Sequence, residues 1–143
     1  LIGEHVKSAP IIHNIKLEAI PTAYILLDGG ARSSVEIISN TSPIPMNKHD
    51  IILAHALAGQ YLGNQFVFLE SGSAAINHAT YKIITIIANE LSIPIIVGGG
   101  INTIESAKSI SIAGADFIVI GSLLENERDN NLIKKICHVI HEN

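Results

Sequence analysis

Apolar residues along this chain form short continuous runs, and most of these runs end at glycine or serine. Short runs rich in β-branched and aromatic residues are typical of strands that are buried on both faces of a parallel sheet. The glycines and serines that follow them predict turns at the strand ends. The runs that predict strands are 23–27, 35–38, 66–69, 95–97 and 116–120.

Between these runs, apolar residues recur with the period of an α-helix. The clearest stripe contains Ile83, Ile84, Ile87 and Leu91, as expected for a helix that covers a sheet with one face. Pro10 is expected to end or kink the first helix. The predicted helices are 1–15, 50–61, 77–91, 103–113 and a last helix that carries Leu132, Ile133, Ile136 and Ile140.

Cap residues support several of these boundaries. Asp50 is a suitable N-cap, and Asn102 with Glu105 forms an Asn-x-x-Glu cap for the helix that follows. Gly63 and Gly114 stand where two helices should end. Strands and helices therefore alternate with short connections, which predicts parallel strands joined by right-handed crossovers.

Two α/β architectures fit this alternation, a doubly wound open sheet and a (β/α)8 TIM-type barrel. Residues 98–103 read Gly-Gly-Gly-Ile-Asn-Thr and lack the third glycine of a dinucleotide-binding loop, so the barrel is favoured. A barrel needs at least about 200 residues. We therefore expect a single domain, 1–143, that forms the C-terminal half or more of a barrel, and we expect the chain, which begins at Leu1, to belong to something longer.

Composition narrows the classes of function. The chain of 143 residues has 48% hydrophobic and 15% charged residues, a net charge of −4 and no cluster of Lys and Arg, so nucleic acid is not an expected partner. No apolar run approaches a membrane-spanning length. The single cysteine, Cys137, excludes an intramolecular disulfide and suits a reducing cytoplasm; we expect it to be buried in the last helix.

Two glycine-rich strand ends carry the strongest chemical signal. Gly98, Gly99 and Gly100 follow one strand, and Gly121 with Ser122 follows the next. Glycines leave backbone N–H groups uncovered, and adjacent parallel strands end at the same edge of the sheet, so we expect a phosphate cup there.

Glu70 lies at the end of the preceding strand, and a carboxylate beside a phosphate cup can accept hydrogen bonds from hydroxyl groups further along the ligand. The pattern predicts binding of a polyol phosphate. Capping of the next helix is the alternative role of Glu70.

Several segments in the same order resemble the geranylgeranylglyceryl phosphate synthases and their heptaprenylglyceryl phosphate synthase relatives. These are 18–26, 39–45, 54–63, 68–75 and 96–101. The resemblance implies a (β/α)8 barrel that transfers a polyprenyl group from its diphosphate to the C3 hydroxyl of sn-glycerol 1-phosphate with Mg²⁺, in ether lipid synthesis. It also implies a cytoplasmic homo-oligomer, and it leaves room for transient contact with a membrane surface.

The resemblance further implies a set of site residues. Glu70 is the expected catalytic residue, which orients the acceptor hydroxyl and takes its proton. The expected substrate contacts are Phe68, Leu69, Glu70, Ser71, Gly72, Ser73, Ala74, Gly99, Gly100, Gly121 and Ser122. The metal ligands of the family lie in the first loops of the barrel, which have no counterpart here, so no ligand is assigned.

This chain departs from the family pattern at three of these positions. Phe68 stands where the family usually has Tyr, Ala74 where it usually has Gly, and Ser122 where it usually has Asn. The first change removes a hydroxyl that helps to bind glycerol. Losing one such hydrogen bond costs about 0.5–1.5 kcal/mol, which weakens acceptor binding without abolishing it.

Other chemistry-bearing residues favour simpler interpretations. None of the seven histidines is paired at i, i+4. His138 and His141 are expected on solvated surface, His55 packed or hydrogen-bonded within its helix, and His78 is a candidate ligand contact. Ser71 and Ser73 have no His or Asp spaced to activate them. Asp28-Gly29-Gly30 ends a strand on the ligand side, where a simple turn is favoured over a functional role.

Two further functions stay open on the residues alone. One is a different phosphate-binding barrel enzyme of the isomerase type, although no catalytic Asp pair or Asp/Cys pair can be placed in this sequence. The other is an inactive fragment or subunit. Transfer of a prenyl group to glycerol 1-phosphate would distinguish all three.

Overall fold

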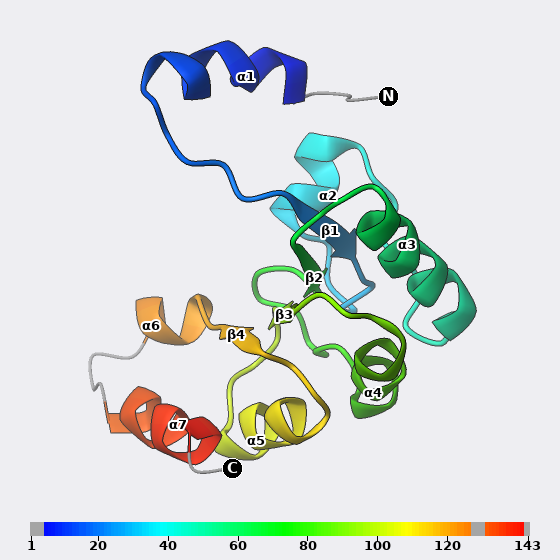
Figure 1. The fold of residues 1–143 in the computed structure, drawn as a ribbon. Helices are drawn as coiled ribbons and strands as arrows, with labels where there is room; N and C mark the ends of the chain where they lie inside the picture. The colour runs from blue at the N-terminus through cyan, green and yellow to red at the C-terminus, as the bar shows by residue number, and fades with distance from the viewer. Residues whose placement is uncertain (1–4, 127–130, 142–143) are drawn as a thin grey trace.

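The computed structural model describes residues 5–126 and 131–141 (Figure 1). Four strands alternate with helices, as the periodicity predicts. The elements are α1 (His5–Asn14), β1 (Thr22–Leu26), α2 (Ser34–Ser39), α3 (His49–Tyr61), β2 (Phe66–Glu70), α4 (Tyr81–Glu90), β3 (Ile95–Gly98), α5 (Ile104–Ile112), β4 (Phe117–Val119), α6 (Ser122–Asn126) and α7 (Asn131–His141).

The strands form one parallel sheet in the order β1-β2-β3-β4. In a doubly wound sheet the strand order reverses, whereas here each strand pairs with the next one in the chain. Sequential parallel pairing is the topology of a (β/α)8 barrel, so the structure is a partial barrel.

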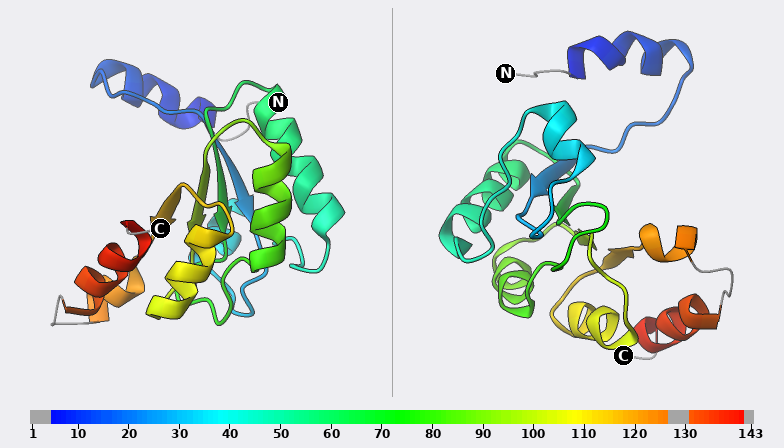
Figure 2. Two further views of the ribbon diagram at one scale, coloured as in Figure 1. Left: turned by 60° about the horizontal axis from the view of Figure 1, so that its bottom comes forward. Right: turned by 180° about the vertical axis from the view of Figure 1, so that it is seen from behind.

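Helices α3, α4 and α5 cover one face of this sheet (Figure 2, left). Val67 and Leu69 of β2 are fully buried against this helix layer. The predicted stripe of α4 is confirmed, since Ile83, Ile84 and Ile87 are fully buried in the same core. Side chains alternate along a strand, so every second residue must face away from the helices.

The opposite face of the sheet is open. Tyr24 is 45% exposed there, Phe117 52% and Val119 45%, and the ring of Phe66 contacts that of Phe117 at 5.7 Å. This face corresponds to the interior of a closed barrel, which side chains would fill. An exposed apolar surface of this kind favours association.

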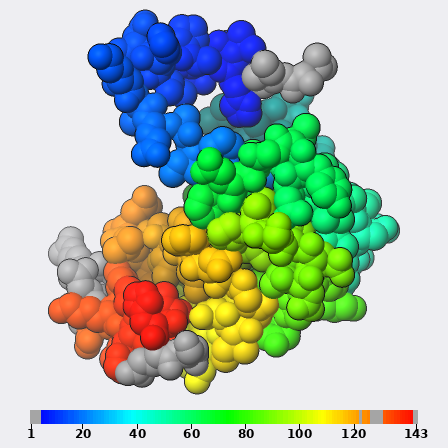
Figure 3. Space-filling view, viewed as in Figure 1, coloured from blue at the N-terminus to red at the C-terminus, as the bar shows by residue number. Residues whose placement is uncertain are grey.

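Helix α1 stands apart from the rest of the molecule (Figure 3). None of its residues is buried, and it continues through Pro10, so the expectation that Pro10 ends the helix is wrong. The first four residues of the predicted helix 1–15 lie outside the described part of the chain.

The predicted strand at 35–38 is wrong, because these residues lie in helix α2. A run of only four residues fits the period of a strand and that of an α-helix equally well. The local helix caps therefore decide which of the two forms. The Ser33 hydroxyl accepts a hydrogen bond from the Glu36 N–H at 3.2 Å, and Asn40 closes the helix in the left-handed conformation.

Three other boundaries differ from the prediction. Helix α4 begins after the N-cap Thr80, not at Asn77, and α3 follows Lys48 without a side-chain cap from Asp50. Thr103 and Ser106 form the capping box of α5, in place of Asn102 with Glu105. At α4 and α5 a hydroxyl in reach of free N–H groups determines the helix start, whereas α3 begins without a side-chain cap.

Helix α6 was not foreseen, and Cys137 of α7 is exposed rather than buried. Ile136, its neighbour, is the residue of α7 that packs into the core. In the ranges that the structure describes, no helix is long and apolar enough to cross a membrane.

We predict that this chain, expressed alone, associates through the open face of the sheet. Sedimentation velocity should show a mass that rises with protein concentration, because apolar side chains there lack a cover. Val119→Lys should shift the population toward the monomer, whereas Ile112→Lys, at an exposed position of α5, should not. A monomer at every concentration would contradict the prediction.

Candidate functional site

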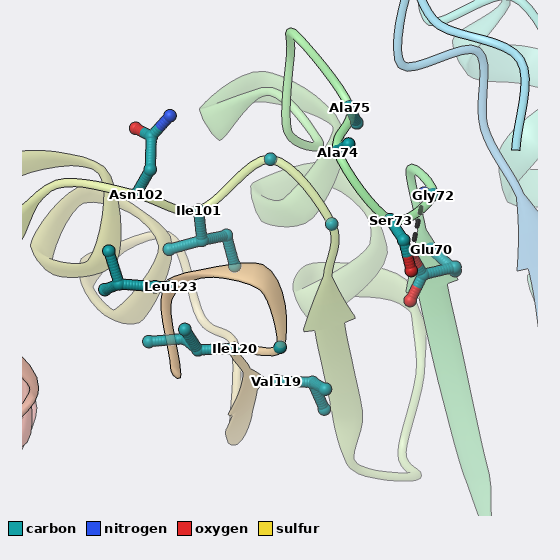
Figure 4. A pocket seen from close by; sticks show the side chains of 13 residues that line it. Glu70, Gly72, Ser73, Ala74, Ala75, Ile101, Asn102, Val119, Ile120 and Leu123 are labelled. Carbon is teal, nitrogen blue, oxygen red and sulfur yellow. Dashed lines mark hydrogen bonds between the residues drawn. The ribbon is translucent and has the colours of Figure 1, made fainter. Parts of the chain in front are cut away.

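A cavity of about 160 Å³ lies where the loops after β2, β3 and β4 meet (Figure 4). Parallel strands end at the same edge of the sheet, so short loops bring these residues together. The cavity, called the cup below, is lined by Glu70, Gly72, Ser73, Ala74, Ala75, Gly99, Gly100, Ile101, Asn102, Val119, Ile120, Gly121 and Leu123.

Most of the residues that the sequence assigned to the site line the cup. They are Glu70, Gly72, Ser73, Ala74, Gly99, Gly100 and Gly121. Leu69 and Ser71 are buried and do not line it. Alternation along β2 directs Leu69 into the core under the helices. Phe68 lies two residues before Glu70 on β2, so it faces the open side of the sheet. Ser122 follows Gly121 directly as the first residue of α6.

Glu70 is the one charged residue among those that line the cup. Its Oε1 accepts a hydrogen bond from the Gly72 N–H at 2.6 Å, shown dashed in Figure 4. Burial raises the pKa of the Glu70 carboxyl above its ordinary value, and the Gly72 N–H, which favours the ionised form, offsets part of this rise in pKa. Glu70 does not cap α4, whose cap is Thr80.

Two glycines of the triplet serve to accommodate this carboxylate. A Cβ on Gly98 would lie 2.8 Å from Glu70 Oε2, and one on Gly99 would lie 2.8 Å from Glu70 Oε1 and 2.7 Å from the Gly72 nitrogen. Gly99 also has φ +84°, where a side chain is strained. A side chain at Gly99 is therefore excluded by the protein itself, whatever ligand binds, whereas one at Gly98 would have to displace the side chains of Glu70 and Phe68.

Gly121 differs from these residues. A Cβ built on it would meet no atom within 4 Å, and its φ lies outside the left-handed region. No neighbouring protein atom excludes a side chain, although Gly121 lines the cup. The open space beside Gly121 is the space that a ligand could fill.

Backbone donors are available around the cup. In the described part of the chain, the N–H groups of Gly99, Gly100 and Gly121 donate to no other group. The residues that line the cup include no Lys, Arg or His. An anion in this cavity would therefore be held by backbone N–H groups.

Tyr24 lies close to Glu70 on the neighbouring strand. Its register partner on β2 is Phe68, and the two rings meet edge to face at 5.2 Å. Burial, together with the smaller effect of the Glu70 charge, raises the pKa of Tyr24 to about 12. Tyr24 therefore stays protonated at any ordinary pH and can act as a hydrogen-bond donor.

Sequence reasoning missed several residues of the cup, namely Ala75, Ile101, Asn102, Val119, Ile120 and Leu123. Ile101 and Asn102 follow the glycine triplet directly, which is the signal that could have found them. The Asn102 side chain points away from Glu70 (Figure 4). The apolar members carry no chemical signal in the sequence.

The remaining candidates lie elsewhere or have other partners. His78 lines a neighbouring groove of about 700 Å³ and hydrogen-bonds the Ala79 carbonyl through Nδ1. His55 is exposed and bonds the Ile51 carbonyl at 2.8 Å within its own helix. Asp28 Oδ1 accepts from the Gly30 N–H at 2.9 Å, as in an Asx turn, and Asp28 also lines the groove that contains His78.

No metal centre can be assembled from the residues that the structure describes, because nowhere among them do three His, Cys, Asp or Glu side chains come together. Ser71 Oγ is buried without a hydrogen-bond partner, but no His is placed to activate it.

Comparison with known proteins places this geometry in context. The PcrB family model matches residues 1–140. The geranylgeranylglyceryl phosphate synthase of Chitinophaga pinensis is 47% identical over 141 residues, which are 99% of this chain and 55% of that protein. The corresponding synthase of Thermofilum pendens is 40% identical over 144 residues, again 99% of this chain and 55% of the relative. The chain thus spans about half the length of these relatives.

Solved structures agree with the family match. The geranylgeranylglyceryl phosphate synthase of Thermoplasma acidophilum, in complex with sn-glycerol-1-phosphate, superimposes with a TM-score of 0.85 at 36% identity. The match covers 99% of this chain and 56% of that one. The enzyme of Thermoplasma volcanium gives a TM-score of 0.85 at 32% identity, with 98% and 55% covered. The resemblance expected from the motifs is confirmed, and the chain belongs to the PcrB family.

Proposed function

We propose that this chain forms the glycerol-phosphate-binding part of a prenyltransferase that joins a polyprenyl diphosphate to the C3 hydroxyl of sn-glycerol 1-phosphate. The observation that carries the proposal is the cup itself, in which unoccupied backbone donors lie opposite a single carboxylate. A related protein with the same fold was solved with sn-glycerol-1-phosphate.

The phosphate of the acceptor would lie at the loops after β3 and β4. Gly121 leaves open space there, and the N–H groups of Gly99, Gly100 and Gly121 can donate to phosphate oxygens. Hydrogen bonds to a charged group contribute about 1.5–3 kcal/mol each, so a few of them suffice without a cation. The Glu70 carboxylate would repel a phosphate and therefore belongs at the other end of the ligand.

Glu70 would bind the hydroxyl end of the acceptor. In the proposed step the C3 oxygen attacks the first carbon of the prenyl chain, a C–O bond forms, and the bond to the leaving diphosphate breaks. The hydroxyl proton passes to the Glu70 carboxylate. A carboxyl whose pKa is raised by burial is a stronger base once it is ionised, so the burial of Glu70 favours this role.

Magnesium dependence remains part of what we propose from the family resemblance, as the charge that would neutralise the leaving diphosphate. No three His, Cys, Asp or Glu side chains come together among the described residues, so no ligand for the ion is assigned to this chain.

Glu70→Gln should preserve the fold and reduce prenyl transfer by about 10²–10⁴-fold, because the amide cannot take the proton. The measurement is transfer from polyprenyl diphosphates of several lengths to sn-glycerol 1-phosphate, with folding followed by circular dichroism. Glu90→Gln, at an exposed position at the end of α4, is the matched control.

Equal turnover by Glu70→Gln and the unchanged chain would make Glu70 structural. Binding of the phosphate ester without any transfer by the unchanged chain would favour another phosphate-binding enzyme or an inactive subunit.

The pH dependence of stability should also report on Glu70. Because its pKa is raised in the folded state, its contribution to the free energy of unfolding is present below the unfolded pKa of about 4.3 and is lost as pH rises through the folded value. Glu70→Gln should thus be at least as stable as the unchanged chain at pH 7, and this advantage should disappear near pH 4. Urea unfolding across this range measures it. A less stable variant at pH 7 would contradict the raised pKa.

Two glycine variants distinguish a glycine that borders space for a ligand from one that the protein's own packing requires. Gly121→Ala should change stability by less than about 0.5 kcal/mol, since its Cβ meets no protein atom, yet it should weaken binding of sn-glycerol 1-phosphate. Gly99→Ala should lower the free energy of unfolding by more than about 1 kcal/mol, because alanine is strained at the positive φ of this position and its Cβ meets Gly72. Urea unfolding and isothermal titration calorimetry provide the two readouts. Unchanged affinity in Gly121→Ala would exclude the cup as the phosphate site.

A further inference from the structure

The order of the strands sets the order of contacts along a ligand in the cup. The loops after β3 and β4 carry the free N–H groups, and β2 carries Glu70. The next strand along the sheet is β1, so a ligand that extends from the phosphate end past Glu70 must next meet β1. The side chains of β1 on the open face are thus placed beside the end of the ligand opposite its phosphate.

Few hydroxyl groups are available on that face. Phe68, two residues before Glu70, presents a bare ring, the Ser71 hydroxyl is buried, and Ser73 belongs to the loop after β2 rather than to a strand. Thr22 lies further down β1, where its hydroxyl donates to the Ile20 carbonyl at 3.2 Å. Tyr24 is the remaining candidate on β1 and β2.

The position of Tyr24 suits a contact with the ligand. It pairs with Phe68, two residues below Glu70, which is about 6.6 Å along the strand and comparable to the length of a tyrosine side chain. The edge-to-face contact with Phe68 fixes the ring beside β2. Tyr24 and Glu70 thus lie on adjacent strands two residues apart in register, and the Glu70 charge adds a smaller contribution to the raised pKa of Tyr24.

We infer that Tyr24 is a second polyol-binding residue, whose O–H donates a hydrogen bond to a hydroxyl oxygen of the acceptor while Glu70 accepts from the acceptor. This inference rests on the proposed function. A hydroxyl group is both donor and acceptor, so a carboxylate and a phenol on adjacent strands satisfy it from two sides. The phenol remains a donor because its pKa lies near 12.

Calorimetric titration of the 143-residue chain tests this with two probes, sn-glycerol 1-phosphate and ethyl phosphate, which has the phosphate ester but no hydroxyl. Tyr24→Phe should weaken binding of sn-glycerol 1-phosphate by about 3- to 10-fold, the effect of one hydrogen bond, and leave ethyl phosphate unchanged. Tyr61→Phe, at an exposed position at the end of α3, should alter neither affinity.

The outcomes are distinct. Equal affinity of Tyr24→Phe and the unchanged chain for sn-glycerol 1-phosphate would overturn the inference and leave the proposed function standing. An equal loss with both probes would also overturn it, since Tyr24 would then act through the fold. If the unchanged chain bound ethyl phosphate as tightly as sn-glycerol 1-phosphate, or bound neither, the proposed function would fail, and the inference with it.

Discussion

The contact between the Glu70 carboxylate and the backbone of two other loops is the constraint on which the site depends. One oxygen of Glu70 accepts the Gly72 N–H, and both oxygens occupy space that a Cβ on Gly98 or Gly99 would take. The carboxylate thus joins the loop after β2 to the loop after β3. Because the group is partly buried, its ionisation is costly, and the same contact that positions it also adjusts its basicity.

This constraint changes the meaning of the glycine triplet. Glycines after a strand are usually explained by the approach of a phosphate. Here Gly98 and Gly99 lack side chains because Glu70 and Gly72 lie against them, whereas Gly121 lacks one beside empty space. Gly98 and Gly99 therefore leave room for the carboxylate and the loop after β2, and Gly121 borders space that is open to a phosphate. Both regions lie within one short stretch of the sheet edge, which suits a small acceptor.

The two faces of the sheet have different consequences. The face toward α3, α4 and α5 holds the core and supports the strands that end at the cup. The other face bears Tyr24, Phe117 and Val119, which are apolar or amphipathic and half exposed. The relatives are about twice as long as this chain, and in a closed barrel their additional strands would cover this face. The core on one face of the sheet thus supports the strands that carry the site, and the site opens toward the exposed face.

The sequence by itself determined the strand positions, the parallel order and the residues at the strand ends, because each depends on local periodicity or on turn residues next to a strand. It misassigned 35–38, where four residues fit two periods and the Ser33 cap decided for a helix. Only the tertiary structure decided which glycines face Glu70 and which face open space, and that Tyr24 lies beside Glu70. Those relations join residues on different strands, and the register between strands is set by packing across the sheet rather than by any one segment.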